Sequence, residues 1–163
     1  MVGACKISFL EPFPPTLDTA GPEEYSRLRP LSYGLTDVFL VCFSVVSPSS
    51  FENVRSKWLP EIRLHSANYP NYRTVLVGTK TDLRHDEYLL QKMAAKLDYP
   101  VDPKDAIALA KEEGMDAYVE TSARQLKGIK GCFDTALSVV LDASGFDYEE
   151  HQIAKQKAQC QLM

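Results

Sequence analysis

The chain lacks long hydrophobic runs, a surplus of positive charge and closely spaced cysteines. No stretch of about 18 apolar residues occurs, so we predict no membrane-spanning helix. The 18 basic residues are outnumbered by 22 acidic ones, giving a net charge of -4. This balance argues against nucleic acid as a partner, because that binding depends on a positive field. The 4 cysteines have no CxxC spacing, and Met1 to Leu10 lack the pattern of a secretion signal, so we expect a reduced, cytoplasmic setting.

Short β-branched runs alternate with longer segments of helical period from Asp37 onward. This alternation is typical of a parallel sheet covered by helices, and it predicts an α/β fold. A chain of 163 residues is long enough to bury one sizeable core, so we expect a single globular domain.

Three strands are expected, at residues 38–45, 74–77 and 118–121. The first of these is apolar on both alternating faces, as a strand buried on both sides should be. Four helices are expected at residues 49–62, 84–96, 103–113 and 129–141. A capping box at Ser49 and Glu52 predicts the start of the first helix, and Pro60 should bend it. Asp102 and Pro103 predict the start of the third, which Gly114 ends.

Polar residues follow the second and third expected strands directly, where a parallel sheet places its ligands. Thr79-Lys80-Thr81-Asp82 resembles the NKxD guanine-specificity element of small GTPases, with threonine in place of asparagine. The carboxylate of Asp82 can accept two parallel hydrogen bonds from the ring N–H and the exocyclic amine of guanine. Adenine would leave a buried acceptor unpaired.

Two further runs extend this resemblance. Thr121-Ser122-Ala123 is similar to the SA element, whose backbone N–H groups approach the guanine carbonyl oxygen. Asp18-Thr19-Ala20-Gly21 resembles the DxxG element, in which the aspartate holds Mg²⁺ through water and the glycine amide meets the terminal phosphate. The segment from Asp18 to Arg63 resembles Rac-type members of the Rho family, and residues 84–103 look like the insert helix of that family.

The resemblance implies a three-layer P-loop NTPase fold of the Ras type, with a mainly parallel sheet, incomplete at its N-terminus. The small-GTPase-like domain would cover residues 18–142, between an atypical N-terminus at 1–17 and a flexible tail at 143–163. It implies binding of GTP or GDP with Mg²⁺, GTP hydrolysis, and a role in signal transduction and cytoskeletal control. The implied nucleotide-binding residues are Asp18, Thr19, Ala20, Gly21, Thr79, Lys80, Asp82, Leu83, Ser122, Ala123 and Arg124.

The resemblance also implies contacts with macromolecules. Exchange factors, dissociation inhibitors and effectors would meet a surface formed by Tyr25, Arg27, Leu28, Arg29, Leu31 and Tyr33. The run Cys160-Gln161-Leu162-Met163 fits a C-a-a-X prenylation signal, and lipid on Cys160 would attach the protein reversibly to the cytoplasmic face of membranes.

Two departures from the family pattern open other interpretations. No GxxxxGK[ST] phosphate loop precedes Asp18, and Pro22 stands where the family places the glutamine that orients the attacking water. Intrinsic hydrolysis is therefore expected to be very slow or absent, with no intact catalytic residue. One alternative is a non-enzymatic module that binds the regulators or effectors of intact relatives. Another is a splice product or mistaken gene model. Ala4 to Leu10 could supply a substitute strand.

Overall fold

The sheet of the protein has five strands. The computed structural model describes residues 4–7, 16–18, 27, 29–34, 36–67 and 71–144. The strands lie in the order β2-β1-β3-β4-β5. Their bounds are β1 Ala4–Ile7, β2 Thr16–Asp18, β3 Val38–Ser44, β4 Arg73–Thr79 and β5 Ala117–Glu120. All three strands predicted after Asp37 are confirmed, with β4 longer than expected.

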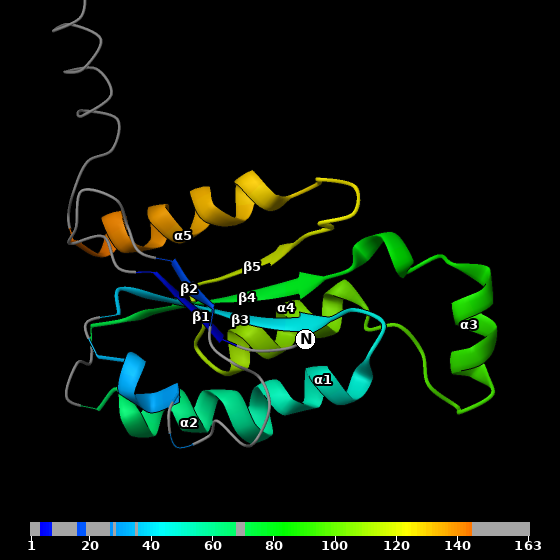
Figure 1. Ribbon diagram of the computed structural model, residues 1–163, viewed down its shortest axis with the longest axis horizontal. Coiled ribbons are helices and arrows are strands. Elements are labelled where there is room, and N and C mark those ends of the chain that lie inside the picture. Colours follow the sequence, from blue (N-terminus) through cyan, green and yellow to red (C-terminus); the bar gives the residue numbers. More distant parts are fainter. Residues whose placement is uncertain are drawn as a thin grey trace, which may run out of the picture.

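Helices cover both faces of this sheet, which confirms the three-layer α/β fold (Figure 1). The helical segments are η2 Arg29–Ser32, α1 Pro48–Asn53, η3 Val54–Trp58, α2 Leu59–His65, η4 Thr81–Leu83, α3 Glu87–Ala94, α4 Pro103–Glu112 and α5 Ile129–Ser144. Helix α5 lies on one face, and α1, α2 and α4 lie on the other. Helix α3 stands beside the sheet, near the edge where β4 ends.

Strand β3 has an apolar core on each side, as its sequence predicted. Phe39, Val41 and Phe43 are fully buried against the α1, α2 and α4 layer. Val38 and Leu40 point to the other face and share a cluster with residues of α5. Apolar side chains on both faces are what a strand between two helical layers needs.

The structure corrects the expected start of the first helix and details its bend. The helix begins at Pro48 after Ser47, and no side-chain cap forms there. The capping box predicted at Ser49 is therefore wrong, and proline at the first helical position sets the start instead. One turn later the helix widens into the π-helical segment η3. This widening directly precedes Pro60, whose missing N–H interrupts the regular hydrogen-bond ladder.

Helices α3, α4 and α5 follow the expected signals closely. The Asp102 carboxylate accepts a hydrogen bond from the Lys104 N–H at 2.8 Å and so caps α4. Gly114 ends this region with φ +68°. Helix α3 is shorter than predicted and begins after Asp86, whose carboxylate caps it. On α5, Cys132 and Ala136 are buried, whereas Phe133 is 44% exposed and does not belong to the core.

Strand β1 lies between β2 and β3 in the sheet, which confirms the substitute strand expected between Ala4 and Leu10. It pairs with β3 in antiparallel register, with Ala4 opposite Val41 and Ile7 opposite Val38. It pairs antiparallel with β2 as well. Strand β2 therefore runs in the same direction as β3, β4 and β5, and β1 alone runs the other way.

The polar residues of η2 are tied to α2 by a buried ion pair. Arg29 donates from Nε and Nη2 to the two carboxylate oxygens of Glu61, at 3.0 Å each. The Tyr33 hydroxyl donates to Oε1 of the same carboxylate at 2.6 Å, and the guanidinium of Arg29 lies 5.1 Å from the ring centre of Trp58. We call Arg29, Glu61 and Tyr33 the η2 triad.

The η2 triad corrects part of the expected partner surface. Arg29 and Tyr33 are 3% and 1% exposed, so they do not present their side chains to a partner. Burial of a charged residue costs free energy unless the charge is paired, and Glu61 supplies that pairing. Leu31 is 81% exposed and Arg27 is exposed, as a contact surface requires, whereas Tyr25 and Leu28 lie outside the described residues.

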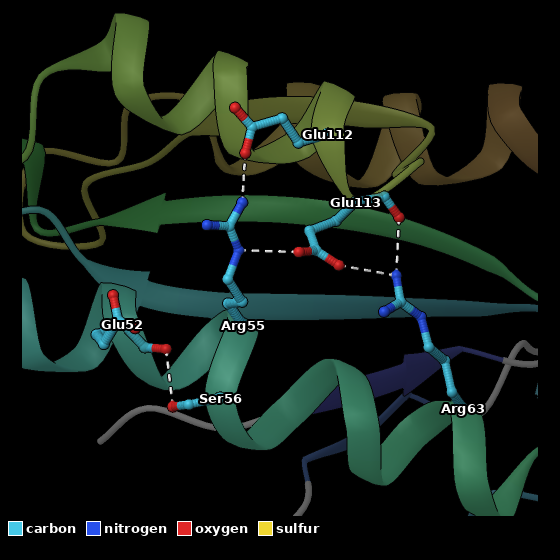
Figure 2. Close-up of polar contacts among 6 residues, drawn as sticks. All are labelled: Glu52, Arg55, Ser56, Arg63, Glu112 and Glu113. Carbon is cyan, nitrogen blue, oxygen red and sulfur yellow. Dashed lines mark hydrogen bonds and ion pairs between the residues drawn. The ribbon is translucent and has the colours of Figure 1, made fainter.

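A second set of ion pairs joins η3 and α2 to the carboxyl end of α4 (Figure 2). Arg55 donates to the carboxylates of both Glu112 and Glu113. Arg63 donates to the Glu113 carboxylate and to its backbone carbonyl, at 3.0 and 2.9 Å. Burial raises the pKa of Glu113, but the hydrogen bonds from Arg55 and Arg63 outweigh it and leave the pKa below its ordinary value. These contacts are exposed, so they orient the helices more than they stabilise them.

We predict that Glu61→Gln lowers the free energy of unfolding by about 2 to 3 kcal/mol, because it leaves the buried guanidinium of Arg29 without its charge partner. Urea titration followed by circular dichroism measures this loss. The control is Lys130→Gln, which breaks an ion pair with Asp134 between side chains that are 88% and 59% exposed. That variant should lose about 0.5 kcal/mol at most, and an equal loss in both would contradict the prediction.

The same loss should depend on pH. Burial raises the pKa of Glu61, but hydrogen bonds from Arg29 and Tyr33 outweigh burial and hold the pKa below its ordinary 4.5. A carboxylate with a lowered pKa stabilises the fold above its unfolded pKa and loses that contribution as pH falls through the folded pKa. The deficit of Glu61→Gln should therefore be full at neutral pH and shrink below pH 4.5. Urea titrations at several pH values test this.

Candidate guanine site

The two loops with the predicted base-binding residues lie side by side at the carboxyl ends of the strands. Strands β4 and β5 are parallel neighbours, and Gly78 pairs with Glu120 at their carboxyl ends. The chain leaves β4 through Thr79 and turns at Lys80, which has a left-handed φ of +60°. This turn leads into η4, so Asp82 comes back against the loop that follows β5.

Three hydrogen bonds fasten η4 to the β5 loop. The Ser122 hydroxyl donates to Asp82 Oδ1 at 2.6 Å. Both the backbone N–H and the hydroxyl of Thr81 donate to the Thr121 carbonyl, at 3.2 Å each. Ser122 is fully buried, so its hydroxyl fixes one oxygen of a carboxylate that remains half-buried. The structure thus brings the NKxD-like and SA-like residues together, as their positions after neighbouring strands predicted.

The loop after β5 closes into a tight turn. Ser122 and Lys127 exchange backbone hydrogen bonds of 2.9 and 3.0 Å. The Ser122 hydroxyl also accepts from the Gln125 N–H at 3.1 Å. Ala123 and Arg124, two of the predicted binding residues, are exposed within this turn. These two residues are therefore accessible to a ligand from the solvent side.

The chemistry of this edge suits a planar base with two neighbouring N–H donors. Asp82 offers a carboxylate whose position is already fixed by Ser122. The exposed stem of Lys80 can lie along an aromatic face, and the preorganised acceptor needs no further ordering when a base binds. Thr79 contributes to the scaffold, since its hydroxyl donates to the Phe43 carbonyl at 2.8 Å. Leu83, the last residue of η4, is half-buried.

Sequence reasoning missed a polar cluster directly behind these loops. Arg84 donates to both carboxylate oxygens of Glu120, at 2.7 and 2.6 Å. The Tyr118 hydroxyl donates to Glu120 Oε1 at 2.5 Å. The hydrogen bond from Arg84 lowers the pKa of Glu120 although burial opposes it, while burial is the main cause of the raised pKa of Tyr118. The signal in the sequence was the spacing of Tyr118 and Glu120, which places both on one face of β5.

The phosphate side of the site is described only in part. Asp18 lies at the carboxyl end of β2, in register with Cys5 of β1, and its side chain is outside the described residues. Thr19, Ala20, Gly21, Pro22 and Cys160 also lie outside them. Among the residues that the structure does describe, no group of three or more His, Cys, Asp or Glu side chains could hold a metal ion. Mg²⁺ is commonly held by one or two carboxylates together with phosphate oxygens.

The direction of β1 bears on the phosphate side. In the resemblance, a parallel first strand delivers the phosphate loop from its carboxyl end. Here the carboxyl end of β1 is Ile7, which lies opposite Val38 at the start of β3. Ile7 therefore lies at the end of the sheet opposite to the one where Lys80 and Asp82 lie. Strand β1 therefore lies between β2 and β3 without leading toward the loops of the candidate site.

The comparison with protein families agrees with this geometry. The Ras family model matches residues 15–142, which is most of the chain and includes both base-binding loops. The chain belongs to the Ras family. Ras-family GTPases bind guanine nucleotides, generally together with Mg²⁺. No helix in the described part of the chain is long and apolar enough to cross a membrane.

We predict that Gly128→Ala disrupts the β5 loop. Gly128 has φ +71°, and an added Cβ would lie 2.1 Å from the Glu120 carbonyl oxygen. The backbone cannot shift without cost, so we expect the free energy of unfolding to fall by about 2 kcal/mol or more. The melting temperature should then fall by roughly 2–4 °C per kcal/mol, as it does in domains of about 150–250 residues.

The matched control is Gly131→Ala, only one helical turn away in α5. No atom lies within 4 Å of a Cβ added at Gly131, and alanine is the better helix former. This variant should melt at the same or a slightly higher temperature. A Gly128→Ala protein as stable as Gly131→Ala would contradict the geometry assigned to the loop.

Proposed function

We propose that this Ras-family chain is a Rho-type signalling protein that recognises the guanine base through Asp82, Lys80 and the loop at Ser122. The observation that carries the proposal is the Ser122–Asp82 hydrogen bond of 2.6 Å, which orients the acceptor for guanine before any ligand arrives. The Rho-type assignment is supported by the 84–103 insert, whose helix α3 stands beside the sheet. Cytoskeletal regulation is the role that such an assignment carries.

Most of its contacts with a nucleotide would be made to the base rather than to the phosphates. Strand β1 runs antiparallel to β3, so it does not bring a phosphate loop to the end of the sheet where Asp82 and Ser122 lie. Phosphate contacts would come from Asp18 and Gly21, with Mg²⁺ held through Asp18. Pro22 offers no side-chain amide to orient water, so we propose binding of GTP and GDP with little or no hydrolysis.

A second candidate function is a non-enzymatic module that occupies regulators or effectors of other GTPases. The antiparallel β1 favours it, because weak phosphate binding would remove the nucleotide cycle and keep the outer surfaces. Leu31 and Leu64 would serve that role, since they are 81% and 71% exposed on elements that the η2 triad fastens together. Exchange factors, dissociation inhibitors and effectors remain the proposed partners in either case.

The proposal predicts saturable, guanine-specific binding by the purified, folded chain. Fluorescent GDP and GTP would be titrated with Mg²⁺ present, and ATP should not compete. Asp82→Asn should weaken GDP binding by about tenfold or more, because the amide loses one acceptor and turns a donor toward the donors of guanine. Its shape is unchanged, so the fold should be kept.

Xanthosine diphosphate makes this test sharper. Xanthine replaces the exocyclic amine of guanine with a carbonyl, so the asparagine of Asp82→Asn can donate to it and accept from the ring N–H. The variant should therefore prefer xanthosine diphosphate to GDP, and the wild-type chain should prefer GDP. Absence of binding by a demonstrably folded wild-type chain would favour the interaction module instead.

A further inference from the structure

We propose that Arg84 and Glu120 are positioning residues, which hold the Asp82 loop in register with the Ser122 loop and thereby set selectivity for the guanine base. This inference rests on the proposed function of the site. Neither residue belongs to the base-binding set, and each lies within two residues of a member of it. We call Arg84, Glu120 and Tyr118 the β5 triad.

The β5 triad joins the two loops through residues just outside the base-binding set. Glu120 is the last residue of β5, two positions before Ser122, and Arg84 follows η4, two positions after Asp82. Their two hydrogen bonds of 2.7 and 2.6 Å form a bidentate contact, which restricts orientation as well as distance. The side chains are only 17% and 29% exposed, so water competes weakly for them.

Neighbouring residues hold this contact in place. The Tyr118 hydroxyl donates to Glu120, and it reaches that position by passing over Gly78 of β4. A Cβ at Gly78 would lie 2.8 Å from this hydroxyl, so glycine is needed for the approach. Gly78 in turn accepts a backbone hydrogen bond from Thr121 at 2.8 Å, which connects the packing of the β5 triad to the start of the Ser122 loop.

The other contacts between the two loops are made by residues within η4. Thr81 donates to the Thr121 carbonyl from its backbone N–H and its hydroxyl, and Asp82 accepts from the Ser122 hydroxyl. The Arg84–Glu120 contact adds a bidentate restraint at the residue that follows η4. Because Thr81 and Arg84 are both held, the chain on either side of Asp82 is restrained, which limits how far the Asp82 carboxylate can reorient.

The chain contains its own matched control. The η2 triad has the same composition and the same pattern: an arginine donates to both oxygens of a glutamate, and a tyrosine donates to Oε1. It lies on η2 and α2, away from the base-binding loops (Figure 1). Glu61→Gln and Glu120→Gln therefore make the same chemical change in the same hydrogen-bond pattern, although the η2 triad is the more deeply buried. Only Glu120 is next to the proposed site.

The experiment measures three quantities in the full chain for wild type, Glu120→Gln, Arg84→Gln, Arg84→Lys and Glu61→Gln. They are the affinity for GDP, the ratio of GDP to inosine diphosphate affinity, and hydrogen exchange of the Thr81 and Leu83 amides. Inosine diphosphate lacks the exocyclic amine, so the ratio reports how well Asp82 is aimed. Melting temperature is recorded for each variant.

The expected result separates the two triads. Glu120→Gln and Arg84→Gln should weaken GDP binding about tenfold, bring the nucleotide ratio toward one, and speed exchange at Thr81 and Leu83. Arg84→Lys, which keeps the charge, should recover part of each effect. Glu61→Gln should lower the melting temperature and leave the ratio and the exchange of these two amides at wild-type values.

Two results would overturn the proposal. One is an unchanged nucleotide ratio and unchanged exchange in a folded Glu120→Gln or Arg84→Gln protein. The other is the same change in Glu61→Gln, which would show a general loss of stability. Failure of the wild-type chain to bind GDP would count against the proposed function instead, and the exchange of Thr81 and Leu83 would still decide whether the β5 triad positions the loop.

Discussion

The parallel pairing of β3 with β4 is the constraint on which the rest of the structure depends. The two strands pair along their whole length, from Val38 opposite Arg73 to Ser44 opposite Thr79. Both are almost fully buried, so each face of the pair needs a helical layer, and parallel strands need long crossovers that supply those helices. Strand β5 is parallel to β4 as well, so the loops after β4 and β5 emerge at the same end of the sheet, and these loops hold the polar residues of the candidate site.

Elements with strong local signals could be predicted, and long-range pairing could not. The apolar run at Val38 and the Asp102–Pro103 helix start were read correctly because each signal is contained in a few neighbouring residues. The direction of β1 was beyond reach, because four residues of strand carry no mark of parallel or antiparallel pairing. The partners available in the folded sheet decide that direction.

The distinction between local signals and long-range contacts also explains which side-chain positions could be predicted. Arg29 and Tyr33 are polar residues of the kind expected at a protein surface. Their burial is favourable because Glu61, 32 residues after Arg29, accepts hydrogen bonds from both. The adjacency of Asp82 and Ser122 followed from strand order alone. The Arg84–Glu120 contact also spans 36 residues. The spacing of Tyr118 and Glu120 places both on one face of β5, but nothing in the sequence indicates that Arg84 pairs with Glu120, so this contact could be found only from the structure.

Strand β1 also has a consequence for solubility. Beside β3, the most apolar strand of the sheet, it covers the backbone from Val38 to Val41. An uncovered strand of this composition presents unpaired N–H and C=O groups to any other chain that can extend alongside it. Four residues near the start of the chain thus shield the segment most able to template self-association. The short β2 strand, rather than β3, then forms that margin of the sheet.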